Sequence, residues 1–261
     1  MIKKLMKYDM KKMFWVLGYI YVICIALAGI SRLFLIGKNI QILAIIGAVF
    51  QGITYSAIGS IIVNTFVQII RTFIVTFYKD ESYLTHTLPV TKDKLLLSKY
   101  LSALIVICSS VIVCFVSLFI MFYSSDFVIG LRALIQTAVT NFNIPTGLFI
   151  FLIVVVLAAQ ICAMISMSFA AIVKANTYNS KRVFKGFIWF VIYYFASMFA
   201  NLLLIVICFV ISGNITSLFA TLLPQGAFLT ILIVGALAYI ACSFIFYFIC
   251  NKQFKKGVNV D

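Results

Sequence analysis

The residues that could do chemistry are few. The chain of 261 residues carries six acidic residues, one histidine and seven cysteines. No two cysteines form a C-x-x-C pair, and a single histidine does not complete a zinc site. A hydrolase needs a base within hydrogen-bond reach of its nucleophile, whereas His86 lies in a polar connection between apolar segments. The sequence therefore predicts no metal site, no catalytic residue and no enzyme.

Nucleotide chemistry is not expected in this chain either. The G-x-x-x-x-G-K-[ST] phosphate loop does not occur in the sequence. We therefore expect no cofactor to be bound by this chain, and any ATP that drives it must be hydrolysed by another protein.

The composition indicates a protein of the lipid bilayer. The chain is 65% hydrophobic and 10% charged, whereas ordinary globular proteins are about 45–50% apolar and about 25% charged. Each of its long apolar stretches exceeds the roughly 18 residues of a membrane helix. We predict an all-α membrane protein with one transmembrane domain, residues 1–261, and six transmembrane helices at about 14–36, 40–70, 100–123, 146–173, 187–211 and 227–250.

The basic residues predict the orientation of these spans. Most of the 20 lysines and arginines lie before the first span, after the second, after the fourth and after the sixth, and only Arg32, Lys38 and Arg132 lie on the opposite side. Because basic residues favour the cytoplasmic side, both termini are predicted to be cytoplasmic. The net charge of +14 follows this pattern, so we expect no nucleic-acid partner.

Residues 1–13 have an amphipathic pattern. Their apolar residues share one helical face, with most of the lysines opposite: Ile2, Leu5, Met6, Met10 and Met13. This pattern is typical of an interfacial helix that lies in the headgroup layer and is attracted to anionic membrane lipid. A solvated basic tail is the alternative interpretation.

The predicted spans contain no carboxylate. Carriers that use protons or sodium usually keep an acidic residue near the middle of the membrane, but the acidic residues here all fall outside the predicted spans. Because some sodium sites use only backbone and hydroxyl oxygens, an ion-coupled carrier is disfavoured and stays an alternative.

Two sets of residues are candidates for a substrate path. The first recurs every fourth residue along the second span, and we call it the small-polar stripe: Gly52, Ser56, Ser60, Asn64 and Gln68. The second is Tyr193 and Tyr194 in the fifth span, whose hydroxyls need hydrogen-bond acceptors. Packing between helices of the same bundle is the alternative for both sets, because small residues four apart allow helices to approach closely.

The connection at 78–94 is the most distinctive segment. It holds three of the six acidic residues and Pro89, which disfavours helix at Leu88. Thr91 is then a candidate N-cap for the next helix. The pattern predicts a short exposed helix on the cytoplasmic side, suited to docking on a partner.

This connection resembles that of ABC-2 type permeases, the six-helix membrane subunits of bacterial ABC exporters. Their loop reads as an acidic pair, Gly-Tyr-Leu, then Thr-Leu-Pro before a Leu-rich helix ending in Lys. Ser82 stands where that family commonly has Gly. The matching residues are Asp80, Glu81, Tyr83, Leu84, Thr87, Leu88, Pro89, Leu95, Leu96, Leu97, Ser98 and Lys99.

The resemblance implies a coupling helix at roughly 79–86 that docks on a separate ATPase subunit, present in two copies, which holds the ATP and Mg. It also implies a second permease subunit, identical or paralogous, in a bacterial cell membrane, and a hydrophobic or amphipathic substrate such as a peptide; exporters of phenol-soluble modulins look similar. The implied ATPase contacts are Asp80, Glu81, Ser82, Tyr83, Leu84 and His86. The alternatives are a channel or ion-coupled carrier that works without an ATPase, and a non-transporting immunity or sensor subunit.

Overall fold

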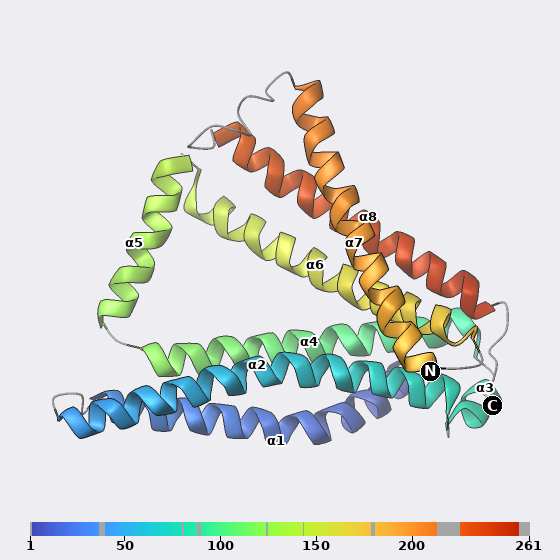
Figure 1. Cartoon of the computed structure of the whole chain (residues 1–261), viewed down its shortest axis with the longest axis horizontal. Coiled ribbons are helices and arrows are strands. Elements are labelled where there is room, and N and C mark those ends of the chain that lie inside the picture. The colour runs from blue at the N-terminus through green and yellow to red at the C-terminus, as the bar shows by residue number, and fades with distance from the viewer. Residues whose placement is uncertain are drawn as a thin grey trace. The chain divides into compact units, whose positions relative to one another are not determined.

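The computed structural model describes residues 2–36, 40–79, 81–87, 90–123, 125–142, 144–178, 181–212 and 225–255. The regular structure of these residues is helical (Figure 1): α1 (Ile2–Ile36), α2 (Gln41–Tyr78), α3 (Ser82–Thr87), α4 (Lys92–Phe122), α5 (Ser125–Phe142), α6 (Thr146–Ala175), α7 (Arg182–Ile211) and α8 (Gln225–Lys255). Within the described residues, six helices are long and apolar enough to cross a bilayer: α1, α2, α4, α6, α7 and α8. The predicted all-α membrane fold is confirmed, and the chain is a multi-pass membrane protein.

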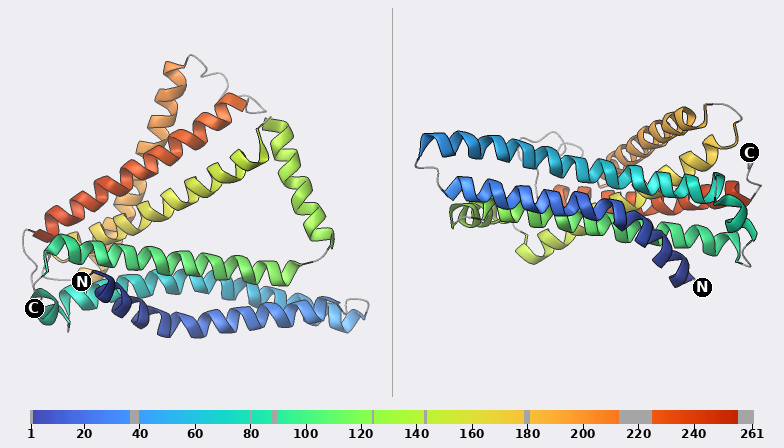
Figure 2. Two further views of the ribbon diagram at one scale, coloured as in Figure 1. Left: turned by 180° about the vertical axis from the view of Figure 1, so that it is seen from behind. Right: turned by 90° about the horizontal axis from the view of Figure 1, so that it is seen from below.

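Several helices extend beyond the predicted spans at their lysine-rich ends. The segment predicted as a separate interfacial helix continues without interruption into the first span, as α1, and Figure 2 shows α1 bending in its N-terminal turns. The second span runs on to Tyr78, and the third begins at Lys92. At 38 residues, α2 is about 57 Å long, well beyond the hydrocarbon thickness of about 30 Å. The charged ends of these helices therefore lie outside the hydrocarbon.

The chain forms two compact units, Met1–Ile129 and Gly130–Asp261, which we call the first and second units. In the first unit α1 packs against both α2 and α4, and α3 lies against α2. Figure 1 shows α1 and α4 running in the same direction and α2 running opposite to them. In the second unit α6 packs against α8 and α7, with α6 and α8 parallel. Each unit thus contributes three long helices.

Hydroxyl groups face each other in the core of the first unit. The Tyr21 hydroxyl lies 2.5 Å from Ser110 Oγ, which lies 2.7 Å from Thr65 Oγ1. Nearer the other end, Ser31 and Thr54 share a hydrogen bond of 2.9 Å. All five residues are buried. Lipid offers no hydrogen-bond partner, so these contacts fix the rotation of α1, α2 and α4 about their axes.

The second unit is held mainly by close packing of small and aromatic residues. Ala163 and Ala170 on α6 have no exposed surface, which allows its neighbours to approach. At the start of α7, a Cβ placed on Gly186 would lie 3.4 Å from the Cβ of Ala175. The rings of Phe142 and Phe228 stack with their centres 4.0 Å apart and thereby join α5 to α8.

We expect Ser110→Ala to lower the free energy of unfolding by about 0.5–2 kcal/mol, because Tyr21 and Thr65 both lose an interhelical partner. The measurement is unfolding of the detergent-solubilised protein by increasing fractions of sodium dodecyl sulfate. The control is Ser56→Ala: Ser56 is exposed and, among the residues that the structure describes, bonds only to the Ile53 carbonyl of its own helix. Equal losses in the two variants would contradict an interhelical role for Ser110.

Candidate functional site

The predicted coupling segment contains a short helix. Between α2 and α4, α3 covers Ser82–Thr87, close to the predicted 79–86, and the Ser82 N–H donates to the Lys79 carbonyl at 2.7 Å. Asp80, Leu88 and Pro89 lie outside the described residues, as do the side chains of Leu84 and His86. The next helix begins directly after Thr91, as predicted, although the Thr91 side chain makes no capping hydrogen bond.

The predicted ATPase-contact residues around α3 differ in exposure. The Tyr83 side chain is 68% exposed and is available to a partner. In contrast, Ser82 is fully buried, and its hydroxyl has no hydrogen-bond partner among the described residues. Glu81 is half-buried, and its carboxylate is directed toward the helices of the first unit. The helix thus presents the Tyr83 side chain outward, while Glu81 directly before it faces the other helices of the first unit.

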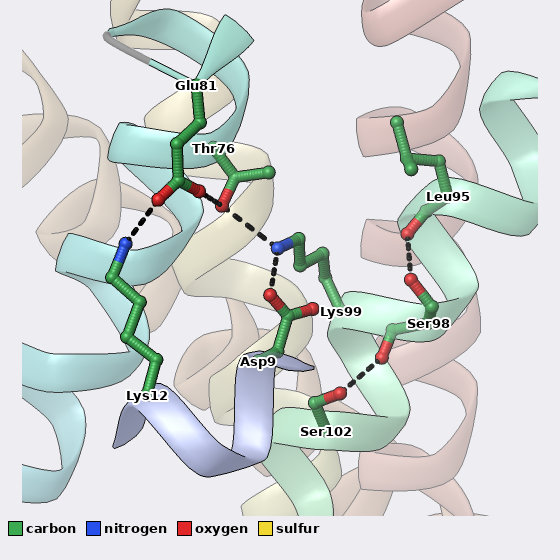
Figure 3. Close-up of polar contacts among 8 residues, drawn as sticks. All are labelled: Asp9, Lys12, Thr76, Glu81, Leu95, Ser98, Lys99 and Ser102. Atoms are coloured by element: carbon green, nitrogen blue, oxygen red, sulfur yellow. Dashed lines mark hydrogen bonds and ion pairs between the residues drawn. The ribbon is translucent and has the colours of Figure 1, made fainter. Parts of the chain in front are cut away.

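Glu81 connects the α3 segment to two long helices. One of its oxygens, Oε1, accepts a hydrogen bond from Lys12 Nζ of α1 at 2.6 Å, forming an ion pair. The other, Oε2, accepts one from the Thr76 hydroxyl of α2 at 3.2 Å. Figure 3 shows Glu81 reaching both helices.

A buried ion pair continues this chain of contacts. Lys99 Nζ of α4 donates to Asp9 Oδ1 of α1 at 2.5 Å and to the Thr76 hydroxyl at 2.9 Å. Asp9 is 3% exposed and Lys99 is 6% exposed. Thr76 therefore bridges the two ion pairs (Figure 3), and we call the connected set the polar cluster: Asp9, Lys12, Thr76, Glu81 and Lys99.

The buried pair is costly to separate. Removing two charges from water carries a large desolvation cost, which the pair repays only while both partners stay together. The second oxygen of Asp9, Oδ2, is buried and has no partner among the described residues, so Lys99 is the main compensation of that carboxylate. The ammonium of Lys99 also lies 5.9 Å from the centre of the Phe77 ring. The polar cluster consequently holds the N-terminal turns of α1 against α4 and the end of α2.

The charge state of Glu81 follows from the same contacts. Partial burial raises the pKa of its carboxyl, but the hydrogen bond and charge of Lys12, the Thr76 hydroxyl and the charge of Lys99 together outweigh it. The net pKa of Glu81 lies below its ordinary value. Glu81 is therefore ionised at neutral pH and keeps its ion pair with Lys12.

Sequence reasoning missed the partners of Asp9 and Lys99. Asp9 falls in residues 1–13, which the amphipathic pattern places in the headgroup layer, and Lys99 is matched only as the last residue of the loop motif. Two signals were present: Asp9 is the one acidic residue among five N-terminal lysines, and Lys99 shares a helical face with the apolar Leu95 and with Ser102.

The small-polar stripe lies on the outer side of α2. Gly52 and Ser56 are exposed, and Ser60, Asn64 and Gln68 are half-buried. Ser56 donates to the Ile53 carbonyl and Ser60 to the Ala57 carbonyl, each at 2.8 Å, and Asn64 Nδ2 donates to the Ser60 carbonyl at 2.9 Å. The stripe is therefore not part of the buried core of the first unit.

The tyrosine candidates belong to the second unit. Tyr193 is half-buried with its ring centre 5.0 Å from that of Phe246 and 5.6 Å from that of Trp189. Tyr194 is 36% exposed and stacks on Phe190 of the same helix at 6.5 Å. The two sets of path candidates therefore belong to different units. Of the predicted site residues, Glu81 is the one that the polar cluster joins to α1, α2 and α4.

Among the residues that the structure describes, no three His, Cys, Asp or Glu side chains are grouped as metal ligands. Comparisons of the whole chain with known protein families, with curated proteins and with solved structures find no match. No family is assigned. What the fold establishes is a multi-pass membrane protein with an anchored short helix between its second and third long helices.

We expect Lys99→Met to lower the free energy of unfolding by about 3–5 kcal/mol, because it leaves the Asp9 carboxylate buried without its partner. The double variant Asp9→Leu with Lys99→Met should recover most of this loss, since it removes both charges. Unfolding in detergent measures both. The control is Lys94→Met, at an exposed lysine of the same helix, where a change within about 0.5 kcal/mol is expected. A Lys99→Met variant as stable as this control would contradict the buried pair.

The contribution of Glu81 to stability should depend on pH. Because its folded-state pKa is below the ordinary value of 4.5, the contribution is fully present above that value and is lost as the pH falls through the folded-state pKa. The difference in unfolding free energy between the native protein and Glu81→Gln should thus be constant near neutrality and shrink in acid. In a Lys12→Met background, the change in unfolding free energy caused by Glu81→Gln should be smaller at pH 7. If this difference in unfolding free energy grew as the pH fell, it would contradict a lowered pKa of Glu81.

Proposed function

We propose that this chain is the membrane subunit of an exporter in a bacterial cell membrane that is driven by a separate ATPase. In this proposal two copies of the ATPase bind at the lysine-rich side, and the chain works as a homodimer or with a paralogous permease. The observation that carries the proposal is the short helix α3, on which Tyr83 faces outward. Glu81, the residue directly before this helix, is bonded to the other members of the polar cluster. The likeness of residues 80–99 to the ABC-2 loop supports the same assignment.

The polar cluster gives α3 a mechanical connection to the bundle. A partner that moves α3 pulls on Glu81, which is bonded to α1 through Lys12 and to α2 through Thr76. Thr76 in turn contacts Lys99 of α4, which holds Asp9 of α1. Because the buried pair resists separation, α1 and α4 would move together with the end of α2. This is the property that a coupling element requires.

In the same proposal the passenger is a hydrophobic or amphipathic molecule, with a peptide as the preferred candidate. The small-polar stripe and the two tyrosines offer small, amide and hydroxyl groups without charge. The small-polar stripe has Gly52 and Ser56 exposed, which suits the wall of a substrate path or an interface with a second subunit. The chain itself supplies membrane passage, and ATP hydrolysis belongs to its partner.

Tyr83→Ala should abolish association with an ATPase. The tagged chain is purified in mild detergent from the cells that produce it naturally, and ATP hydrolysis by the eluate is measured with mass spectrometry of the co-purified proteins. We expect a P-loop ATPase and ATP hydrolysis with the native chain and their loss with Tyr83→Ala, because an exposed aromatic anchor often supplies much of the binding energy.

The matched control for this experiment is Tyr8→Ala, since Tyr8 is 63% exposed and lies on α1 outside the loop. It should keep the ATPase. The absence of ATP hydrolysis from the native eluate, or its retention in the Tyr83→Ala eluate, would contradict the assigned contact. Uphill transport by the reconstituted chain alone, under an ion gradient and without ATP, would favour a carrier instead.

A further inference from the structure

A group of lysines and aromatic rings lies in the second unit where α6 ends and α7 begins. Lys185 and Trp189 are spaced four residues apart, so they share one face of the first turns of α7, and Lys181 is the residue directly before this helix. Lys174 in the last turn of α6 and Tyr178 just after it lie against this face. We call these five residues the lysine–aromatic site.

The rings hold the lysines in place. The ammonium of Lys174 lies 5.4 Å from the centre of the Trp189 ring, and that of Lys185 lies 4.3 Å from the centre of the Tyr178 ring. Cation–π contacts of this kind orient a cation while leaving its positive charge in place. Lys181, the N-cap residue of α7, is exposed. Three lysines therefore lie at the end of α6 and the start of α7, two of them held by aromatic rings.

This charge has almost no acidic counterpart within the second unit. Between Gly130 and Val260 the sequence contains no aspartate or glutamate, and the unit's one acidic residue is the terminal Asp261. The N-terminus of α7 adds positive potential to the lysines, and its first turn contains no acidic residue. The arrangement is complementary to an anion supplied from outside this unit.

The position of the site selects the kind of anion. It lies at the end of two membrane-spanning helices, and the charge distribution of the sequence predicts that this end is cytoplasmic. Tryptophan is typical of the headgroup level of a bilayer, and anionic lipids attract lysines at that depth. We propose that the lysine–aromatic site binds the headgroup of an anionic phospholipid. This inference is independent of the export proposal.

Tryptophan fluorescence can report occupancy of the site directly. The chain has two tryptophans, so Trp15→Phe leaves Trp189 as the single reporter. The purified Trp15→Phe protein in a neutral detergent is titrated with phosphatidylglycerol, with phosphatidylcholine and with soluble glycerol phosphate. We expect a saturable change in Trp189 emission with phosphatidylglycerol alone. An equal response to phosphatidylcholine, or saturation by glycerol phosphate at the same concentrations, would overturn the proposal.

Lysine variants separate a defined site from general surface charge. In the Trp15→Phe background, Lys174→Gln and Lys185→Gln should each weaken the phosphatidylglycerol response about fivefold, the effect expected for about one lysine near an anionic surface. Lys181→Gln should weaken the response by a similar factor, and because Lys181 is exposed, this variant loses little packing. The control is Lys252→Gln, at an exposed lysine near the end of α8. Unchanged affinity in the three site variants, or an equal loss with Lys252→Gln, would overturn the site.

Discussion

The burial of one ion pair determines how the first unit is assembled. Asp9 and Lys99 are both almost fully buried, so neither charge is stable in that position without the other. Detaching the N-terminal turns of α1 from α4 would expose or strand both charges. The pair therefore holds this end of α1 against α4 at Asp9, although the exposed lysines around it suit the headgroup layer. Amphipathicity alone predicts an interfacial helix, and the buried carboxylate explains why this segment is continuous with the span.

Thr76 extends this constraint to the loop. Its single hydroxyl accepts from Lys99 and donates to Glu81, so a buried pair and a partly exposed pair share one residue of α2. The partly exposed pair is individually weak, since surface ion pairs contribute little. This pair matters because of its position: through Thr76 it connects the α3 segment to the buried Asp9–Lys99 pair, which is costly to separate.

The sequence predicted the features that depend on local composition. The six spans and the short helix after the second one follow from hydropathy and from the polar, proline-containing connection, and the structure has both. The partner of Asp9 was beyond this reasoning because it lies 90 residues away in the chain. Periodicity also found the small-polar stripe but did not reveal which side of α2 packs. That side is determined by interhelical bonds such as Thr65 with Ser110, which no local pattern contains.

The two polar sides of α2 differ in how their groups are satisfied. On the packed side Thr54 and Thr65 bond to α1 and α4, so these hydroxyls hold the bundle together. On the outer side the Ser56 and Ser60 hydroxyls donate to carbonyls of their own helix and require no neighbour. A self-satisfied polar surface tolerates lipid, water or a passing amphipathic molecule, because none of them has to replace a lost hydrogen bond. The outer side of α2 can therefore change its surroundings without disturbing the contacts that hold the three helices together.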